Sequence, residues 1–263
     1  LSNVYHATPV FKNELINRDK TSAQANSARN KLIFALVNHQ NEEDLGIEKF
    51  PAEKSIYRAV LKATGLHAKN NQGNWELAKS EDFEQGEDPY NLTPLWRRID
   101  SFLTETEHSP CSMVELNKEL FAPPYGIKEG MLPLLYSVAM LAYSDELAIT
   151  EDGAYVPYVT FEHLERFIKR PDKFTVQRVK IEGVNRKIIM EYSKALFADG
   201  GQRTMLEIAK PIAKFIDDLP AYTKQTDSLQ VATKAVRDAF KLSKSPVKLL
   251  LEDLPKALGM KLT

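Results

Sequence analysis

The side chains best placed to do chemistry are cations that gather late in the chain. Seven Lys and Arg residues lie between positions 169 and 187, and they are Lys169, Arg170, Lys173, Arg178, Lys180, Arg186 and Lys187. Clustered cations neutralise backbone phosphates, and this neutralisation supplies most of the affinity of proteins for nucleic acid. The first two also stand where a helix is expected to end, so the helix dipole gives them a structural reason to be there. We therefore take these residues as candidate nucleic-acid contacts, with a structural role as the alternative.

The motifs of common catalytic sites are missing from the sequence. Neither a G-x-x-x-x-G-K-[ST] phosphate loop nor a G-x-S-x-G nucleophile motif occurs. The five histidines are scattered and Cys111 is the one cysteine, so neither a zinc site nor a disulfide is expected. Carboxylate pairs such as Asp217-Asp218 are expected on solvated helix faces, because acid–base work needs a cleft. We expect no catalytic residue, no metal and no cofactor in this chain.

A stretch in the middle of the chain follows the order of a winged helix-turn-helix. Ser112 stands three positions before Glu115, which is the capping-box spacing that begins a helix. A Pro-Pro pair then ends this helix. Residues 128–143 are apolar on nearly every face, which predicts a buried helix. Asp152-Gly153, between two β-prone runs, predicts a tight hairpin that is the candidate wing.

The charge of this central unit argues against DNA reading. A winged helix that reads DNA needs cations on its second helix and on its wing. Here the helix offers only Lys128, whereas the wing carries Glu146, Glu151 and Asp152. A role in packing or in protein contact is therefore favoured for this unit.

Apolar spacing and turn residues predict the remaining elements. Before the centre we expect helices over residues 10–18, 21–37 and 51–65 and a hairpin across 70–73, which suggests a second winged-helix-like unit. After the centre we expect a helix from Thr160 to Arg170, and a strand over 174–181 with a β-bulge at Gln177-Arg178. Four further helices are expected over 184–198, 204–218, 229–242 and 247–258.

Together these elements define a mainly α fold with small β-hairpins, winged helix-turn-helix-like units and a C-terminal helical bundle. Four parts are expected along the chain. They are a helical segment with the first winged-helix-like unit (1–79), an acidic linker (80–92), the central winged-helix unit (93–159) and a basic strand-plus-helical domain (160–263).

The net charge of −1 conceals an asymmetry between the two parts of the chain. Residues 1–159 hold 15 Lys and Arg against 23 Asp and Glu, whereas residues 160–263 hold 20 against 13. A basic part beside an acidic part suggests either docking between them or a surface for a polyanion.

The composition is that of a soluble protein, with 43% hydrophobic and 27% charged residues. No apolar run is long enough to cross a membrane, and the first residues lack the layout of a secretory signal. A single cysteine suits a reducing compartment, so we expect a cytoplasmic protein. Because the sequence begins with Leu1 and not with Met, we expect it to be a piece of a longer protein.

Several phrases in the sequence resemble a known group of proteins. They are residues 9–18 (PVFKNELINR), 46–51 (GIEKFP), 55–58 (SIYR), 64–67 (TGLH) and 121–130 (FAPPYGIKEG). Together they resemble the region downstream of the ATPase core in very large bacterial P-loop proteins of phage-defence islands, the BREX-like and related ATPases. The resemblance covers most of the chain and implies a helical and winged-helix extension that relays the state of the ATPase to DNA or to partner subunits. It implies no catalytic residue here, because the nucleotide site of those proteins lies in another domain.

Three hypotheses follow. The first is a non-catalytic interaction and regulatory region of a larger NTPase in defence against foreign DNA, with other domains or subunits of that assembly as partners. The second is a module that binds nucleic acid directly through the basic later half. The third is an enzyme whose site has no recognisable motif. Salt-dependent DNA binding separates the first two, and nucleotide turnover by the chain would favour the third.

Overall fold

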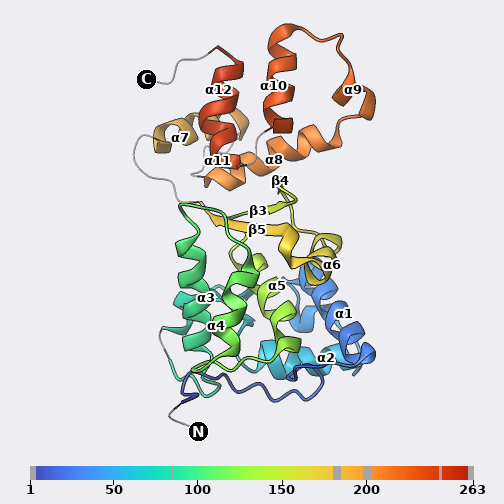
Figure 1. The fold of residues 1–263 in the computed structure, drawn as a ribbon, viewed down its shortest axis with the longest axis vertical. Helices are drawn as coiled ribbons and strands as arrows, with labels where there is room; N and C mark the ends of the chain where they lie inside the picture. Colours follow the sequence, from blue (N-terminus) through green and yellow to red (C-terminus); the bar gives the residue numbers. More distant parts are fainter. Residues whose placement is uncertain (1–3, 85, 180–184, 198–202, 243–244, 260–263) are drawn as a thin grey trace. The chain divides into compact units, whose positions relative to one another are not determined.

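Helices dominate the fold (Figure 1), and two small antiparallel sheets accompany them. The computed structural model describes residues 4–84, 86–179, 185–197, 203–242 and 245–259, with the backbone alone at 185–188 and 241–242. The prediction of a mainly helical chain with small β-hairpins is confirmed. None of the helices in the described part of the chain combines the length and the apolar character that crossing a bilayer requires.

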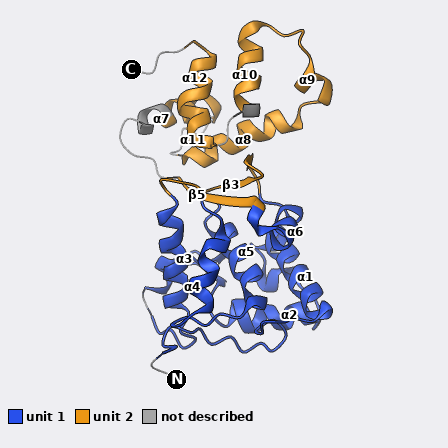
Figure 2. Ribbon diagram, in the orientation of Figure 1, with its two compact units in different colours: residues 1–106, 111–144, 159–172 blue, residues 107–110, 145–158, 173–263 orange. Residues whose placement is uncertain are grey.

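The chain forms two compact units whose segments alternate along the sequence (Figure 2). Unit 1 comprises residues 1–106, 111–144 and 159–172, and unit 2 comprises residues 107–110, 145–158 and 173–263. The division into four consecutive parts stays a prediction. The three helices of the expected central winged helix belong to unit 1, whereas its hairpin belongs to unit 2.

Unit 1 is built from helices and one two-stranded sheet. Its elements are α1 (Ala23–His39), η1 (Glu43–Gly46), α2 (Ala52–Ile56), η2 (Tyr57–Lys62), β1 (His67–Lys69), β2 (Trp75–Leu77), η3 (Ser80–Phe83), α3 (Thr93–Glu105), η4 (Met113–Leu116), α4 (Asn117–Phe121), η5 (Glu129–Met131), α5 (Leu132–Ala142) and α6 (Phe161–Lys169). Each predicted helix start at Ser112 and Thr160 is confirmed. The Ser112 N–H donates to Glu115 Oε1 (3.2 Å), and the Thr160 N–H donates to His163 Nδ1 (3.2 Å).

Helix α5 lies in the interior of unit 1, as its apolar sequence predicts. Leu134, Leu135 and Val138 are fully buried. Each such side chain stabilises the fold by about 1.5–3 kcal/mol relative to an exposed position. The hydroxyl of Tyr136 donates to Asn117 Oδ1 (2.6 Å), which satisfies a polar group that would otherwise be buried alone. Because α5 is surrounded by protein, it is not available to enter a DNA groove.

The predicted helix over residues 10–18 is wrong. Asn13 Oδ1 accepts the N–H groups of Leu15 (3.1 Å) and Ile16 (3.3 Å), and Asn17 Nδ2 donates to the carbonyl of Phe11 (3.1 Å). These local side-chain bonds compete with the helical ladder. The segment instead runs as a strap across the unit, where the Gly130 N–H donates to the carbonyl of Arg18 (3.0 Å).

Gly130 makes this close approach of two backbones possible. A Cβ atom at this position would lie 2.4 Å from the Ile16 carbonyl oxygen and 2.7 Å from that of Arg18. The nearby Arg29 guanidinium, which is buried, donates through Nη1 to the Gly130 carbonyl (3.1 Å). The strap is therefore held against the start of η5 by contacts that only glycine permits.

The three-stranded sheet of unit 2 has the order β4-β3-β5, from β3 (Leu147–Glu151), β4 (Ala154–Val156) and β5 (Phe174–Arg178). Asp152 (φ 48°) and Gly153 (φ 79°) form the predicted hairpin turn, in which both central residues take the left-handed backbone.

The predicted β-bulge at Gln177-Arg178 is wrong. The β3–β5 register runs without a break from Glu151↔Phe174 to Leu147↔Arg178. The alternation of apolar and polar residues is interrupted at Arg178 for another reason. Arg178 takes a position on the same face as Phe174 and Val176, and its ion pair with Glu146 makes that position tolerable.

The helices of unit 2 follow the sheet. They are α7 (Asn185–Leu196), α8 (Met205–Asp218), α9 (Ala221–Gln225), α10 (Val231–Leu242), α11 (Pro246–Lys248), η7 (Leu249–Asp253) and α12 (Leu254–Ala257). The short helix η6 (Pro171–Lys173) comes directly before β5 in the sequence. Thr204 and Glu207 form a reciprocal capping box at the start of α8, with distances of 2.6 and 3.1 Å. Apolar side chains from α7, α8, η7 and α12 share one core, against which α10 packs. The helices expected after residue 204 are confirmed, and α9 is an addition.

Candidate functional site

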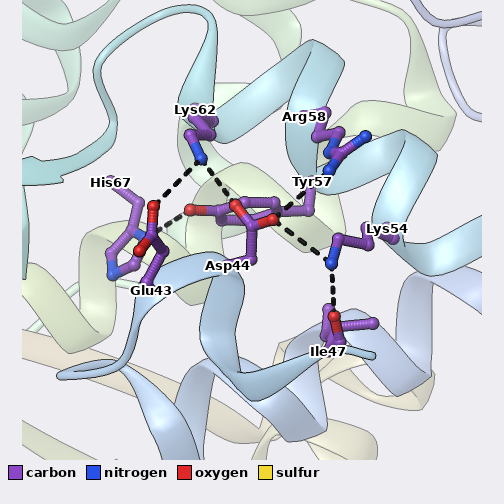
Figure 3. Close-up of polar contacts among 8 residues, drawn as sticks. All are labelled: Glu43, Asp44, Ile47, Lys54, Tyr57, Arg58, Lys62 and His67. Carbon is purple, nitrogen blue, oxygen red and sulfur yellow. Dashed lines mark hydrogen bonds and ion pairs between the residues drawn. The ribbon is translucent and has the colours of Figure 1, made fainter. Parts of the chain in front are cut away.

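A left-handed turn between α1 and α2 is the most unusual backbone feature of unit 1. Asp44 (φ 51°), Leu45 (φ 53°) and Gly46 (φ 64°) follow one another in η1. Side chains rarely take positive φ, although Asp tolerates it better than most. Leu45 is buried, and a Cβ at Gly46 would lie 2.7 Å from Glu42 Oε2. The turn points the Asp44 carboxylate at the helix that follows (Figure 3).

Three cations of α2 and η2 converge on this one carboxylate. Lys54 Nζ lies 3.2 Å, Arg58 Nη2 3.5 Å and Lys62 Nζ 2.6 Å from the nearer Asp44 oxygen. Their four-residue spacing places all three on one face of the helix. Lys62 also lies 3.8 Å from the carboxylate of Glu43. We call Asp44 and the three cations Lys54, Arg58 and Lys62 the Asp44 cluster.

The cluster is shielded enough for its charges to matter. The Asp44 side chain is 16% exposed and that of Lys54 is 11% exposed, and Lys54 also donates to the Ile47 carbonyl (2.5 Å). The hydrogen bond from Lys62 lowers the pKa of Asp44 to about 2, against burial, and Lys54 adds to the effect. Asp44 is therefore ionised at neutral pH, where it serves as a counter-charge and not as a general acid or base.

Beside the cluster, a buried tyrosine and a buried histidine form a hydrogen-bonded chain. Tyr57 Oη lies 2.9 Å from His67 Nδ1, and His67 Nε2 lies 2.7 Å from the carbonyl oxygen of Gln40. A carbonyl can only accept, so Nε2 carries the proton and Nδ1 accepts from the tyrosine hydroxyl. Burial lowers the pKa of His67, which keeps the ring neutral, and burial raises the pKa of Tyr57, helped by the negative charges of Asp44 and Glu43.

The histidine is also fixed from the strand side. The Trp75 ring stacks on His67 with centroids 5.1 Å apart. Lys62 and Lys69 lie over the same indole, each with Nζ 5.4 Å from the ring centroid. Because both nitrogens of His67 are engaged and its ring is fully buried, it offers no position from which to exchange a proton with a substrate. The arrangement connects α1, η2 and the β1–β2 hairpin.

A pocket of about 540 Å³ lies on the other side of the same hairpin. The cross-strand pair Ala68 and Glu76 line it, together with carboxylates from the segment before α3. Two of these carboxylates accept hydrogen bonds from backbone N–H groups. Asp82 accepts the Lys79 N–H (2.7 Å), and Asp88 accepts the N–H groups at the start of α3. Among the described residues no group of three or more His, Cys, Asp or Glu side chains could hold a metal ion.

The described side chains of the predicted cationic set each face a carboxylate. Lys169 pairs with Glu165 (3.5 Å), Arg170 with Asp172 (2.9 Å), Lys173 with Asp152 (2.7 Å) and Arg178 with Glu146 (2.6 Å). Lys169 and Arg170 belong to unit 1, and Lys173 and Arg178 belong to unit 2. Lys180 and the side chains of Arg186 and Lys187 lie outside what the structure describes. Nucleic-acid binding by this set stays a prediction.

The sequence did carry a signal for the Asp44 cluster that the motif search passed over. Lys54, Arg58 and Lys62 recur every four residues, beginning ten positions after the end of the acidic run at 42–44. Nothing in the spacing predicts the Tyr57–His67 contact, which depends on how the hairpin folds back. Cys111 is half-buried, and burial raises the pKa of its thiol, which suits the structural role expected of it.

Comparison with known proteins returned nothing for this chain: no protein-family model matches it, and neither a curated protein nor a solved structure was found to be similar.

Proposed function

We propose that this chain is a non-catalytic interaction and regulatory region of a larger bacterial NTPase that defends the cell against foreign DNA. In this proposal it couples the state of the ATPase to partner subunits or to DNA in the cytoplasm. The resemblance of residues 9–18 and 121–130 to such proteins motivates the assignment. The catalytic nucleotide site would lie in another domain of the same assembly.

The observation that best supports an interaction role is a set of exposed apolar side chains on three helices of unit 2. The consecutive helices α8, α9 and α10 each expose a large apolar side chain, namely Phe215, Tyr222 and Val231. Exposed apolar side chains on neighbouring elements are typical of surfaces that contact protein. The partner that we assign to this surface is another domain or subunit of the NTPase.

A second observation supports a non-catalytic role for this chain. The polar groups of the Asp44 cluster and of the Tyr57–His67 pair are engaged in contacts that hold the fold together. Asp44 answers three cations, and both nitrogens of His67 are occupied. We further propose that α3, α4 and α5, followed by the β3–β4 hairpin, serve as a winged-helix unit for protein contact. The burial of α5 and the carboxylate at Asp152 favour that use over DNA reading.

The test compares this chain alone with the natural polypeptide that contains it, purified from its own cells. We expect the chain to hydrolyse no ATP or GTP and the natural polypeptide to hydrolyse one of them. Replacing Phe215 and Tyr222 by Ser in the natural polypeptide should change the rate of hydrolysis or its response to partner subunits, with an unchanged circular dichroism spectrum. Turnover by the chain alone, or a natural polypeptide without NTPase activity, would contradict the proposal.

A further inference from the structure

Three cations lie over two aromatic rings of unit 1. The Arg58 guanidinium lies 5.4 Å from the ring centroid of Phe50, Lys62 follows one turn later, and both Lys62 and Lys69 lie 5.4 Å from the ring centroid of Trp75. The two groups of contacts meet at Asp44, which Arg58 and Lys62 both contact, and we call the five residues the cation–aromatic row: Phe50, Arg58, Lys62, Trp75 and Lys69. Figure 3 shows Arg58 and Lys62 projecting from the same helix.

The row is accessible from solvent. Phe50 is 84% exposed, which is unusual for a ring of its size, and the Arg58 side chain is about half exposed, at 49%. Lys69 is exposed, and Trp75 is partly exposed. An aromatic ring that stands almost wholly in water buries nothing for the fold, so the folding of unit 1 does not account for Phe50.

The row is also the basic part of an acidic region. Residues 54–79 hold five Lys and Arg and one Glu, within a segment 1–159 that holds 15 Lys and Arg against 23 Asp and Glu. Asp44 and Glu43 face three of these cations, and Lys69 adds a fourth. These four cations outnumber Asp44 and Glu43, and the pocket that Lys62 and Lys69 line also holds the carboxylates of Glu76, Asp82, Glu87 and Asp88.

We propose that the cation–aromatic row binds single-stranded nucleic acid. Bases would stack on Phe50 and Trp75, while Arg58, Lys62 and Lys69 would neutralise the phosphates between them. Single-strand binders combine stacking rings with a positive track in this way, because every base has a face that can stack. A duplex keeps its bases paired and would engage only the cations. This site lies outside the proposed regulatory role and does not depend on it.

The experiment measures binding of a labelled 12-nucleotide oligo-dT to the whole chain by fluorescence anisotropy over a range of salt concentrations. We expect binding that weakens with salt, and at least fivefold weaker binding of a duplex of equal length. We also expect quenching of Trp75 emission, which Trp75→Phe abolishes, because the other tryptophan, Trp96, is fully buried.

Three further variants leave the contacts of Asp44 with both lysines in place. Phe50→Ala should weaken binding about tenfold through lost stacking. Arg58→Gln and Lys69→Gln should each reduce the slope of log K against log salt by about 0.7, the value for one single-strand phosphate. Lys118→Gln, at an exposed cation on α4, is the matched control and should change neither quantity. Circular dichroism and melting curves establish that each variant is folded.

Four results would overturn the proposal. One is the absence of binding at low salt, and another is wild-type affinity in both Phe50→Ala and Lys69→Gln. A third is equal competition by polyglutamate, which would make the surface a site for an acidic protein. The fourth is an affinity that falls with Lys169→Gln and Lys173→Gln but not with the row variants, which would move the site to the later cationic set.

Discussion

The two cationic regions of this protein pair their cations with carboxylates in different ways. In the Asp44 cluster, three cations from one helix share a carboxylate that is largely shielded from water. In the set between residues 169 and 187, each described cation has its own carboxylate, and most of these pairs stand in solvent. Removing a shielded anion that three cations share is costly, whereas solvent-exposed ion pairs contribute little to stability. The richest run of cations in the sequence is therefore not the region where charge matters most.

A substitution of Asp44 tests the difference between the two regions most directly. Asp44→Asn keeps a residue that tolerates the left-handed backbone but leaves Lys54 and its neighbours without their anion. We expect a loss of about 3 kcal/mol in the free energy of unfolding, measured by urea denaturation at pH 7. Asp152→Asn is the matched control, because Asp152 also has a positive φ and pairs with one lysine in solvent. A loss below about 1 kcal/mol is expected there. Equal losses of unfolding free energy in Asp44→Asn and Asp152→Asn would show that the two carboxylates contribute equally to stability.

A second test uses His67, which stiffens the first region. His67→Phe keeps a ring against Trp75 but leaves the Tyr57 hydroxyl and the Gln40 carbonyl unpaired, so a loss of about 2 kcal/mol is expected at pH 7. Because burial lowers the pKa of His67, the unfolded chain takes up the proton first as pH falls below about 6.5. The wild type therefore loses the contribution of His67 to stability in that range, and the variant has no such contribution to lose.

The measured quantity is the gap in unfolding free energy between wild type and His67→Phe, which should narrow from pH 7 to pH 5. A gap that stays constant or widens would contradict the neutral, buried histidine. His108→Phe, at an exposed histidine, is the control and should stay within about 0.5 kcal/mol of the wild type at pH 7.

Within the second region, the pair between Arg178 and Glu146 sharpens the comparison, because it is the most shielded of the four. Its side chains are 11% and 31% exposed, with two hydrogen bonds of 2.6 and 2.9 Å. Glu146→Gln should cost about 1–2 kcal/mol, between the effects at Asp44 and at Asp152. Urea denaturation measures this cost, and a cost as large as that of Asp44→Asn would mean that the carboxylate shared by three cations is no harder to replace than Glu146.

The smallest effect is expected at the Lys169–Glu165 pair, which lies one helical turn apart on the surface of α6. Glu165→Gln should change the free energy of unfolding by no more than about 0.5 kcal/mol, and raising the salt to 1 M should erase the difference. A larger effect that persists in salt would mean that this pair acts in a shielded site after all.

Local signals in the sequence predicted much of the fold. The capping residues at Ser112 and Thr160, the Asp152-Gly153 turn and the apolar circumference of α5 each depend on neighbouring residues, and each is confirmed. The segment from residue 10 to 18 failed because Asn13 binds its own backbone, which the apolar spacing does not reveal.

The candidate site was harder to predict because its parts come together only in three dimensions. Asp44 meets Lys62 across 18 positions, and His67 meets Gln40 across 27. The cations from residue 169 onward are neighbours in sequence, and each of their described members pairs with a carboxylate, which the spacing of the cations alone does not reveal.

The strap at the start of the chain has a consequence for how the protein is made. The Ala7 N–H donates to the Pro124 carbonyl (3.2 Å), and the Arg18 carbonyl accepts from Gly130. During synthesis at about 5–20 residues per second, the strap must wait roughly 5–20 s before these partners leave the ribosome. Phe11 and Ile16, which are buried in the finished unit, belong to the segment that waits for these contacts. Nascent chains of this protein should therefore be clients for chaperones that bind short apolar segments near the ribosomal exit.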